Sequence, residues 1–361
     1  MLVNNHHLII NLSVLFAKPT GIATYASQVT PFLQELNPTL LTSQDHPGFN
    51  CHNVPANMTP LQGRTGHIRR LLWTQFQLPR IYRNLQGSLL FSPLPEAPIA
   101  SDCRLVVMVH DLIPLRFPRL TSPLLPYFRY YVPQVLKNSL HIVCNSQSTA
   151  KDIVDFYKIS SKKITTIPLG YDPEHFKVQK SNKTGSYFLY LGRQDAYKNL
   201  HRLIAAFAAL TDRSNYELYL VGSRDHRYSA QLLELSKKLG VDKQVKFLDY
   251  VSYSELPLLL AGAIALVFPS LWEGFGIPAL EAMACGTPVI TSNISGLPEV
   301  VGDAGILVNP YSVSSIAEAM KNVANNAQIR RDMSHKSLKR AAEFSWQKTG
   351  EKTKEILEQY I

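Results

Sequence analysis

The sequence predicts an α/β fold built from two doubly wound parallel-sheet domains that face each other across a cleft. Short apolar or β-branched runs alternate with longer amphipathic stretches along the whole chain, which is typical of parallel sheets covered by helices. The alternation falls into two sets, and 361 residues are enough for two domains with separate cores. In such sheets the ligand binds beyond the carboxyl ends of the strands.

The first set of predicted strands lies in the first half of the chain. These strands are Leu8–Leu15, Ser88–Phe91, Leu105–Val109, Ile142–Cys144 and Ile164–Ile167. The earliest run also has the apolar character of a signal-peptide core. It lacks a basic segment before it and a small-residue cleavage site after it, so a buried first strand is favoured.

The second set of elements follows a break in periodicity at Tyr171–Ser186, which we interpret as a linker. Its predicted strands are Tyr187–Leu191, Glu217–Val221, Val245–Leu248, Ala265–Phe268, Val289–Thr291 and Ile306–Val308. Helical patterns fill the gaps, for example at Leu200–Leu210 and Ser229–Leu239. A last helix, Ser345–Tyr360, has no strand after it and could cross back to the first domain. The predicted domains are therefore residues 1–172 and 173–344, with 345–361 as this helix.

Composition narrows the class of protein. Hydrophobic residues make up 45% and charged residues 18%, as in folded globular proteins, and no apolar run reaches the roughly 20 residues of a membrane span. The four cysteines are widely spaced without a C-x-x-C pair, so we expect reduced thiols and a cytoplasmic protein. The net charge of +10 favours polyanionic partners such as phosphates or anionic lipid. No nucleic-acid motif is present, so nucleic acid is not expected.

The most informative segment is Phe268–Glu281, in which Glu273 and Glu281 stand at either end of a glycine-rich turn. The apolar run Ile264–Phe268 leads into it and the helical pattern Pro278–Ala284 leads out. A helix N-terminus favours a diphosphate, whereas carboxylates accept hydrogen bonds from hydroxyl groups. A diphosphate joined to polyols is a nucleotide sugar.

A second segment, Leu189–Leu200, has the chemistry of a diphosphate clamp. A predicted strand ends at Gly192, a helix begins near Asn199, and Arg193 and Lys198 flank the loop between them. Alone, these cations are more simply interpreted as solvated surface charges. The two-glutamate turn in the same half favours the clamp.

A polar pair, His110-Asp111, follows the strongly apolar strand Leu105–Val109 and is expected to face the cleft. His110 has a structural alternative, a hydrogen bond at the strand end. Asp111 either orients His110 or closes the following turn.

Together these motifs resemble the retaining glycosyltransferases of family 4, also called group 1 glycosyltransferases, which have the GT-B fold of two Rossmann-like domains. The resemblance covers nearly the whole chain. The motifs that carry it are E-x7-E at Glu273 and Glu281, G-R-x4-K-N at Gly192–Asn199, the blocks Ser295–Val308 and Thr166–Phe176, and a loop at Lys18–Tyr25.

The resemblance implies a role for each matching residue. Glu273 is expected to contact the donor sugar and Glu281 the ribose, while Arg193 and Lys198 hold the diphosphate and stabilise the leaving group. His110 is expected to contact sugar and phosphate. The predicted catalytic residues are His110, Glu273, Arg193 and Lys198. The predicted nucleotide-sugar-binding residues are Gly21, Gly192, Arg193, Lys198, Gly222, Leu248, Glu273, Gly274, Phe275, Gly276, Ile277, Leu280 and Glu281.

No cofactor and no metal ion are expected, because the sequence holds no D-x-D motif and the two cations replace the metal. The loop Lys18–Tyr25 has one glycine, Gly21, where many family members have two, so it either contacts phosphate or shapes the acceptor side. Retention is inferred from the family, whose members are thought to use a front-face route in which the departing phosphate accepts the acceptor proton.

The sequence determines the donor and the acceptor less well than it determines the site residues. The base is expected against Gly222 and the strand end Phe247–Asp249, whose backbone contacts do not encode it. UDP-glucose is favoured as the donor, with GDP-mannose as the alternative. The same two-domain architecture also occurs in nucleotide-sugar epimerases and phosphorylases, and a non-catalytic nucleotide-sugar-binding subunit would share it as well.

The expected acceptor is a saccharide or lipid-linked glycan in polysaccharide biosynthesis. His67–Phe76 and Phe117–Lys137 mix basic and aromatic residues. Packing on the first sheet is favoured for them over contact with anionic lipid at the inner face of the membrane.

Overall fold

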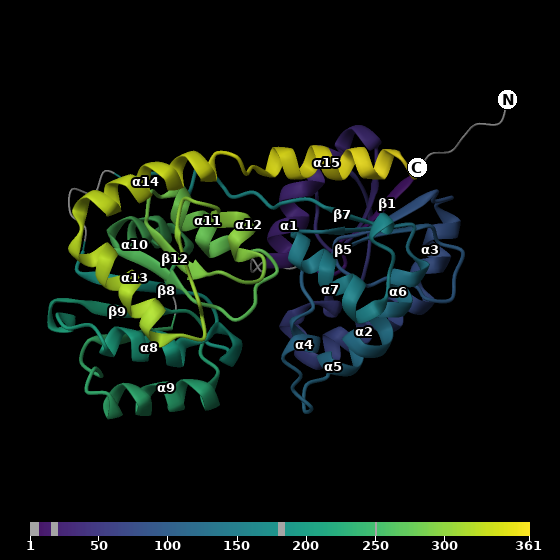
Figure 1. The fold of residues 1–361 in the computed structure, drawn as a ribbon. Coiled ribbons are helices and arrows are strands. Elements are labelled where there is room, and N and C mark those ends of the chain that lie inside the picture. Colours follow the sequence, from purple (N-terminus) through teal and green to yellow (C-terminus); the bar gives the residue numbers. More distant parts are fainter. Residues whose placement is uncertain (1–6, 16–20, 180–184, 250) are drawn as a thin grey trace. The chain divides into compact units, whose positions relative to one another are not determined.

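The computed structural model describes residues 7–15, 21–179, 185–249 and 251–361, which form two compact units. The first unit comprises Met1–Gly170 together with Trp346–Ile361, and the second comprises Tyr171–Ser345. Each unit is built on a parallel sheet with helices packed against it (Figure 1). In the part of the chain that the structure describes, no helix is both long and apolar enough to cross a membrane.

The described part of the first unit contains a seven-stranded sheet with the order β3-β2-β1-β4-β5-β6-β7 and parallel pairing throughout. Its strands are β1 Leu8–Asn11, β2 Thr39–Thr42, β3 Asn50–Asn53, β4 Leu89–Ser92, β5 Leu105–Val109, β6 His141–Cys144 and β7 Ile164–Thr166. The first strand is shorter than the predicted Leu8–Leu15, because Leu15 N–H donates to Leu12 O (2.9 Å) and the chain turns there. The sequence did not predict β2 and β3.

Helices of the first unit pack on the sheet through a continuous apolar core. Side chains from one face of β1, β2, β4, β5 and β6 meet buried residues of α2, α3, α6 and α7, including Trp73, Tyr82, Val135 and Ile153. The helical elements are α1 Gly21–Val29, η1 Thr30–Leu36, η2 Ala56–Met58, η3 Pro60–Gln62, α2 Gly63–Phe76, α3 Leu78–Asn84, α4 Ile113–Arg116, α5 Leu124–Pro126, η4 Tyr127–Tyr131, α6 Val132–Asn138, α7 Gln147–Tyr157 and η5 Ser161–Lys163.

The described part of the second unit contains a six-stranded parallel sheet with the order β10-β9-β8-β11-β12-β13. Its strands are β8 Tyr187–Leu191, β9 Glu217–Val221, β10 Val245–Leu248, β11 Ala265–Phe268, β12 Val289–Ser292 and β13 Ile306–Val308. They agree with the predicted strands, apart from one further residue at the end of β12. Because β8 lies beside β11 as well as β9, the loops that follow these three strands emerge side by side.

Helices lie on both sides of this second sheet (Figure 1), so it is doubly wound. Helix α8 packs against α9 and α13, whereas α11 packs against α10, α12 and α14. The helical elements are η6 Ala196–Lys198, α8 Leu200–Ala208, η7 Arg213–Asn215, α9 His226–Lys238, η8 Tyr253–Glu255, α10 Leu256–Gly262, α11 Ile277–Ala284, α12 Leu297–Val301, α13 Val313–Asn325 and α14 Ala327–Ala341.

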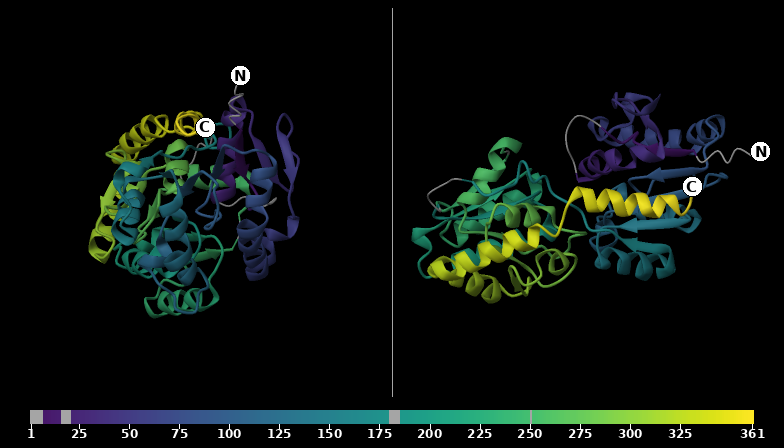
Figure 2. Two further views of the ribbon diagram at one scale, coloured as in Figure 1. Left: turned by 90° about the vertical axis from the view of Figure 1, so that its right-hand side faces the viewer. Right: turned by 90° about the horizontal axis from the view of Figure 1, so that it is seen from above.

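The last helix, α15 (Trp346–Glu358), is part of the first unit although it follows the second in sequence (Figures 1 and 2). It packs against α1 and η1. Thr349 Oγ1 donates to Pro168 O (2.8 Å). Gly350 lies so close to Phe32 that an added Cβ would come within 2.4 Å of its ring. Of the predicted linker Tyr171–Ser186, residues 180–184 lie outside the described residues.

Candidate functional site

Two glycines bring the loops after β8 and β9 together. Gly192 and Gly222 have φ angles of 146° and 133°, which side chains disfavour, and a Cβ on Gly222 would lie 2.2 Å from Gly192 O. Gly192 N–H donates to Val221 O and Gly222 N–H to Leu248 O, both at 2.9 Å. The predicted residues Gly192, Gly222 and Leu248 therefore lie at adjacent strand ends, where they shape the backbone.

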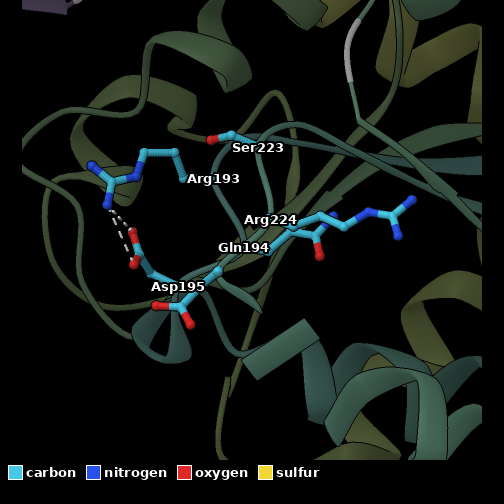
Figure 3. A pocket seen from close by; sticks show the side chains of 6 residues that line it. Arg193, Gln194, Asp195, Ser223 and Arg224 are labelled. Carbon is cyan, nitrogen blue, oxygen red and sulfur yellow. Dashed lines mark hydrogen bonds and ion pairs between the residues drawn. The ribbon is translucent and has the colours of Figure 1, made fainter. Parts of the chain in front are cut away.

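Arg193 lies beside a pocket of about 360 Å³ at these strand ends (Figure 3). Its carbonyl accepts a hydrogen bond from Tyr190 Oη (2.8 Å), while its side chain is 73% exposed and pairs with Asp195 at 3.2 Å. Figure 3 shows Arg193 and Asp195 pointing toward each other and Arg224 extending the opposite way. The lining residues are Arg193, Gln194, Asp195, Ser223, Arg224 and Asp225. An exposed guanidinium at the end of a parallel strand suits an anionic ligand.

Lys198 and Glu273 form an ion pair between the loops after β8 and β11. Lys198 Nζ lies 2.5 Å from Glu273 Oε1, and both residues are buried. The ammonium also lies 5.1 Å from the centroid of the Tyr197 ring and 5.3 Å from that of Phe268. The two side chains that the sequence assigns separately to diphosphate and sugar are thus in direct contact.

The loop after β12 supports Glu273 through its backbone. Glu273 N–H donates to Ser295 Oγ and Gly296 N–H donates to Glu273 O, both at 3.2 Å. Gly296 leaves room for this approach, since a Cβ there would lie 2.5 Å from Gly274 O. The sequence places Ser295 in a motif without a role, and only the fold shows that it holds the Glu273 loop.

The turn before α11 presents its backbone, rather than its side chains, to the candidate site. The Phe275 side chain is buried and meets the Phe344 ring edge-on, with centroids 5.9 Å apart. Gly276 has a φ of 109°, and a Cβ there would come 2.6 Å from Leu297. Leu280 is fully buried and Ile277, the first residue of α11, is half-buried.

Asn199, the last residue of the G-R-x4-K-N motif, connects three loops. It has a left-handed φ of 66° and is completely buried. Its Nδ2 donates to Pro269 O (3.0 Å) and Pro310 O (2.7 Å), after β11 and β13. Asn199 therefore holds the loops in place instead of facing a ligand.

Glu281 lies on α11, half-buried, and burial raises its pKa from the ordinary 4.5 to about 8. Its charge adds to the effect of burial on Cys285, whose pKa rises to about 12, and contributes to the raised pKa of Tyr253. Among the described residues, no cation and no hydrogen-bond donor pairs with this carboxyl. It is available to the hydroxyls of a ligand.

Glu281→Gln is expected to make the protein more stable at alkaline pH. Because the folded state holds the Glu281 proton more tightly than the unfolded state, wild-type stability falls as pH rises from about 4.5 to about 8. The variant has no carboxyl at this position and does not lose this stability. The thermal midpoints of the wild type and the variant should therefore coincide near about pH 5 and separate near about pH 9. Glu318→Gln, at an exposed position on α13, should show no such gap. A difference in thermal midpoint that does not change with pH would contradict a Glu281 pKa raised by burial.

His110 lies in the first unit, directly after β5. Its Nε2 lies 2.9 Å from Pro93 O, so Nε2 carries the proton and Nδ1 is an acceptor. Burial lowers its pKa to about 4, so the ring is neutral at pH 7. The rings of Tyr25 and His110 meet edge to face, with their centroids 5.1 Å apart. Asp111 Oδ1 accepts from Ile113 N–H (3.0 Å), so Asp111 closes the turn, as one of its two predicted roles required.

Gly21 is the first residue of α1, and a Cβ there would meet no atom within 4 Å. The preceding part of the predicted loop, Lys18–Thr20, lies outside the described residues. Gly21 and His110 belong to the first unit, and the other predicted site residues belong to the second.

A buried ion pair that the sequence did not reveal holds the loop that binds His110. Arg70 on α2 contacts Glu96 through two hydrogen bonds, Nε to Oε2 (2.5 Å) and Nη2 to Oε1 (2.8 Å), and Nη1 donates to Met58 O (2.9 Å). Ser92 Oγ donates to Glu96 O (2.8 Å). The loop after β4, which carries the Pro93 carbonyl, is buried between these anchors.

Two family models match the chain in succession. The description "Glycosyltransferase Family 4" covers residues 19–175, and "Glycosyl transferases group 1" covers residues 171–340. An O-antigen chain mannosyltransferase of Salmonella typhimurium is 30% identical over 88% of this chain and 90% of its own length. O-antigen chain mannosyltransferase B of Escherichia coli is 38% identical over 45% of this chain and 42% of its length.

Solved structures share the fold along nearly the whole chain. The lipopolysaccharide glycosyltransferase WaaG aligns with a TM-score of 0.72 at 19% identity, covering 97% of this chain and 99% of its own. HepE of Anabaena, solved with UDP and glucose, aligns with a TM-score of 0.76 at 17% identity, covering 98% and 100%. At this identity the likeness establishes the GT-B fold and leaves the ligand open.

Proposed function

Because this chain belongs to the group 1 glycosyltransferases, a family of enzymes, we propose that it transfers a mannosyl group from GDP-mannose to a growing polysaccharide chain, with retention. The choice of GDP-mannose as the donor rests on one observation. An O-antigen chain mannosyltransferase matches this chain along most of its length. An MMP alpha-(1->4)-mannosyltransferase of Mycolicibacterium hassiacum is also similar, at 31% identity over 60% of this chain and 53% of its own length. These relatives favour GDP-mannose over UDP-glucose, the donor that the sequence alone favoured.

The diphosphate of the donor binds to Arg193 and Lys198 in this proposal. Arg193 is exposed at the pocket, so its guanidinium can turn from Asp195 to a phosphate. The Lys198 ammonium has three N–H donors, of which Glu273 takes one, and the others remain for phosphate oxygens. Both cations would stabilise the charge on the leaving diphosphate without a metal ion.

Glu273 binds hydroxyls of the transferred sugar in this proposal, with Lys198 and Ser295 holding its position. Because Lys198 contacts Oε1, the second carboxylate oxygen is free to accept from a hydroxyl. Glu281 accepts from the ribose hydroxyls. His110 presents the unprotonated Nδ1 to a sugar hydroxyl and, being neutral, does not act as a proton donor near pH 7.

A matched set of four donors tests the base and the sugar separately. Purified protein is incubated with GDP-mannose, GDP-glucose, UDP-glucose and UDP-galactose, and both hydrolysis and thermal stabilisation are measured. We expect GDP-mannose to be hydrolysed fastest and GDP to stabilise more than UDP. The same protein carrying Glu273→Gln is the background control. Preferential hydrolysis of UDP-glucose would overturn the proposed donor while leaving the glycosyltransferase family intact.

A further inference from the structure

We propose that Asp249, held in place by Arg224, recognises the guanine base of the donor. Asp249 directly follows β10, and Arg224 lies in the loop after the neighbouring strand β9. The sequence assigned only backbone contacts to the base at this strand end, and these do not distinguish one base from another. Asp249 would instead select GDP-mannose through its side chain, so this inference rests on the proposed function.

The guanidinium of Arg224 is fixed by contacts with the end of β10. Arg224 Nε forms an ion pair with Asp249 Oδ1, and Arg224 Nη2 donates to Phe247 O (3.1 Å). Its guanidinium carbon also lies 5.9 Å from the centroid of the Phe247 ring. Figure 3 shows Arg224 extending away from Arg193 and Asp195. Arg224 therefore holds the Asp249 carboxylate on the side of the pocket away from the proposed phosphate position.

The carboxylate of Asp249 is open to a ligand. Its side chain is 68% exposed, and Arg224 is the single cation that pairs with it in the part of the chain that the structure describes. Because Arg224 contacts Oδ1, the lone pairs of Oδ2 remain available to the donors of a ligand. An ion pair this exposed contributes little to stability, so a role in holding the fold explains it poorly.

The proposed positions of the diphosphate and the ribose direct the base to this end of the sheet. The diphosphate lies at Arg193, after β8, and the ribose at Glu281, on α11. Burial, Asp172 and Glu281 together raise the pKa of Tyr253 to about 12, so η8, which follows β10, lies close to Glu281. A ribose at Glu281 is therefore beside the segment after β10, and the base attached to it lies next to the end of that strand.

The hydrogen-bonding edge of guanine complements a carboxylate. Its N1–H and 2-amino groups are adjacent donors, and each can donate to one oxygen of Asp249. Uracil has a single N–H between two carbonyl oxygens, which a carboxylate repels. Hypoxanthine, the base of IDP, keeps N1–H but lacks the amino group, and xanthine, the base of XDP, has an oxygen in its place. The affinities for the four nucleotides therefore test Asp249 separately from the diphosphate that they share.

Calorimetry of the full-length protein with GDP, IDP, XDP and UDP tests the proposal. We expect the wild type to bind GDP roughly tenfold to a hundredfold more tightly than IDP, because IDP leaves one carboxylate oxygen unpaired. Asp249→Asn exchanges an acceptor for a donor. It should remove the preference for GDP and bind XDP roughly tenfold more tightly than the wild type does. Its UDP affinity should change by less than about twofold, which shows that the variant is folded.

Arg224→Gln removes the group that holds the carboxylate, so it should reduce the preference for GDP over IDP roughly fivefold. The matched control is Asp242→Asn, at an exposed aspartate in the turn before β10, which should bind all four nucleotides like the wild type.

Two kinds of outcome would overturn the inference. Equal affinity of the wild type for GDP and IDP, or a preference for GDP that Asp249→Asn leaves intact, would exclude base recognition by Asp249 while GDP-mannose stays the proposed donor. Tighter binding of UDP than of GDP by the wild type would overturn the proposed donor together with this role of Asp249.

Discussion

Glu273→Gln is expected to lower turnover by roughly a hundredfold to a thousandfold, the cost of removing one well-placed electrostatic partner from an active site. The amide keeps the volume of the side chain but loses the charge that Lys198 pairs with at 2.5 Å. It also replaces an acceptor for a sugar hydroxyl with a donor. Turnover of the donor, measured beside a circular dichroism spectrum, checks the result. Near-normal turnover would exclude a role for Glu273 in sugar binding.

Lys198 supplies the second half of this test. Lys198→Ala should weaken GDP binding, measured by calorimetry, and it also leaves the Glu273 carboxylate buried without its partner. We therefore expect turnover of the double variant Lys198→Ala/Glu273→Gln to be only slightly below that of the less active single variant, as for residues that act as a unit. Lys246→Met, which removes an exposed ion pair with Glu217, is the control. Unchanged GDP affinity in Lys198→Ala would rule out the clamp.

Glu96→Ala is expected to destabilise the first unit by about 3–5 kcal/mol, since it strands the buried Arg70 without its partner. Urea unfolding followed by circular dichroism measures the change. Arg70→Met/Glu96→Gln removes both charges and should recover much of the loss.

The surface ion pair of Lys354 with the exposed Glu35 provides the control for this prediction, because breaking it with Glu35→Ala should change stability far less than Glu96→Ala does. The loop that Glu96 anchors carries the Pro93 carbonyl, which accepts from His110. This hydrogen bond raises the His110 pKa against the effect of burial, so weakening it in Glu96→Ala should lower that pKa further, observable by NMR titration. A loss of stability similar to that of Glu35→Ala would contradict the importance of the buried pair.

The strands that the sequence predicted well are short runs rich in apolar residues, and such runs are visible without knowledge of their neighbours. In β5 and β8 the central residues of the run are fully buried. The strands it missed lie toward one edge of the first sheet. Asn50–Asn53 has a polar sequence and is mostly exposed, so it pairs with β2 through its backbone while its side chains give no signal.

The basic and aromatic segments show a different limit. The sequence favoured packing on the first sheet over contact with lipid for His67–Phe76. The structure confirms the packing, because Trp73 is buried in the core, yet it leaves Ile68, Leu72 and Phe76 exposed on the other side of the same helix. The amino-acid composition of this segment cannot distinguish the packed side of the helix from its exposed side, since both sides carry apolar residues.

The family, the alternation of strands and helices, and the residue types of the candidate site can all be predicted from the amino-acid sequence alone. They follow from local periodicity and from motifs whose spacing lies within one segment. The contact of Lys198 with Glu273, the joining of three loops by Asn199 and the buried pairing of Arg70 became visible in the folded chain. They depend on strand order: β8 lies beside β11, so side chains 75 positions apart meet at one sheet edge, and no local pattern records that neighbourhood.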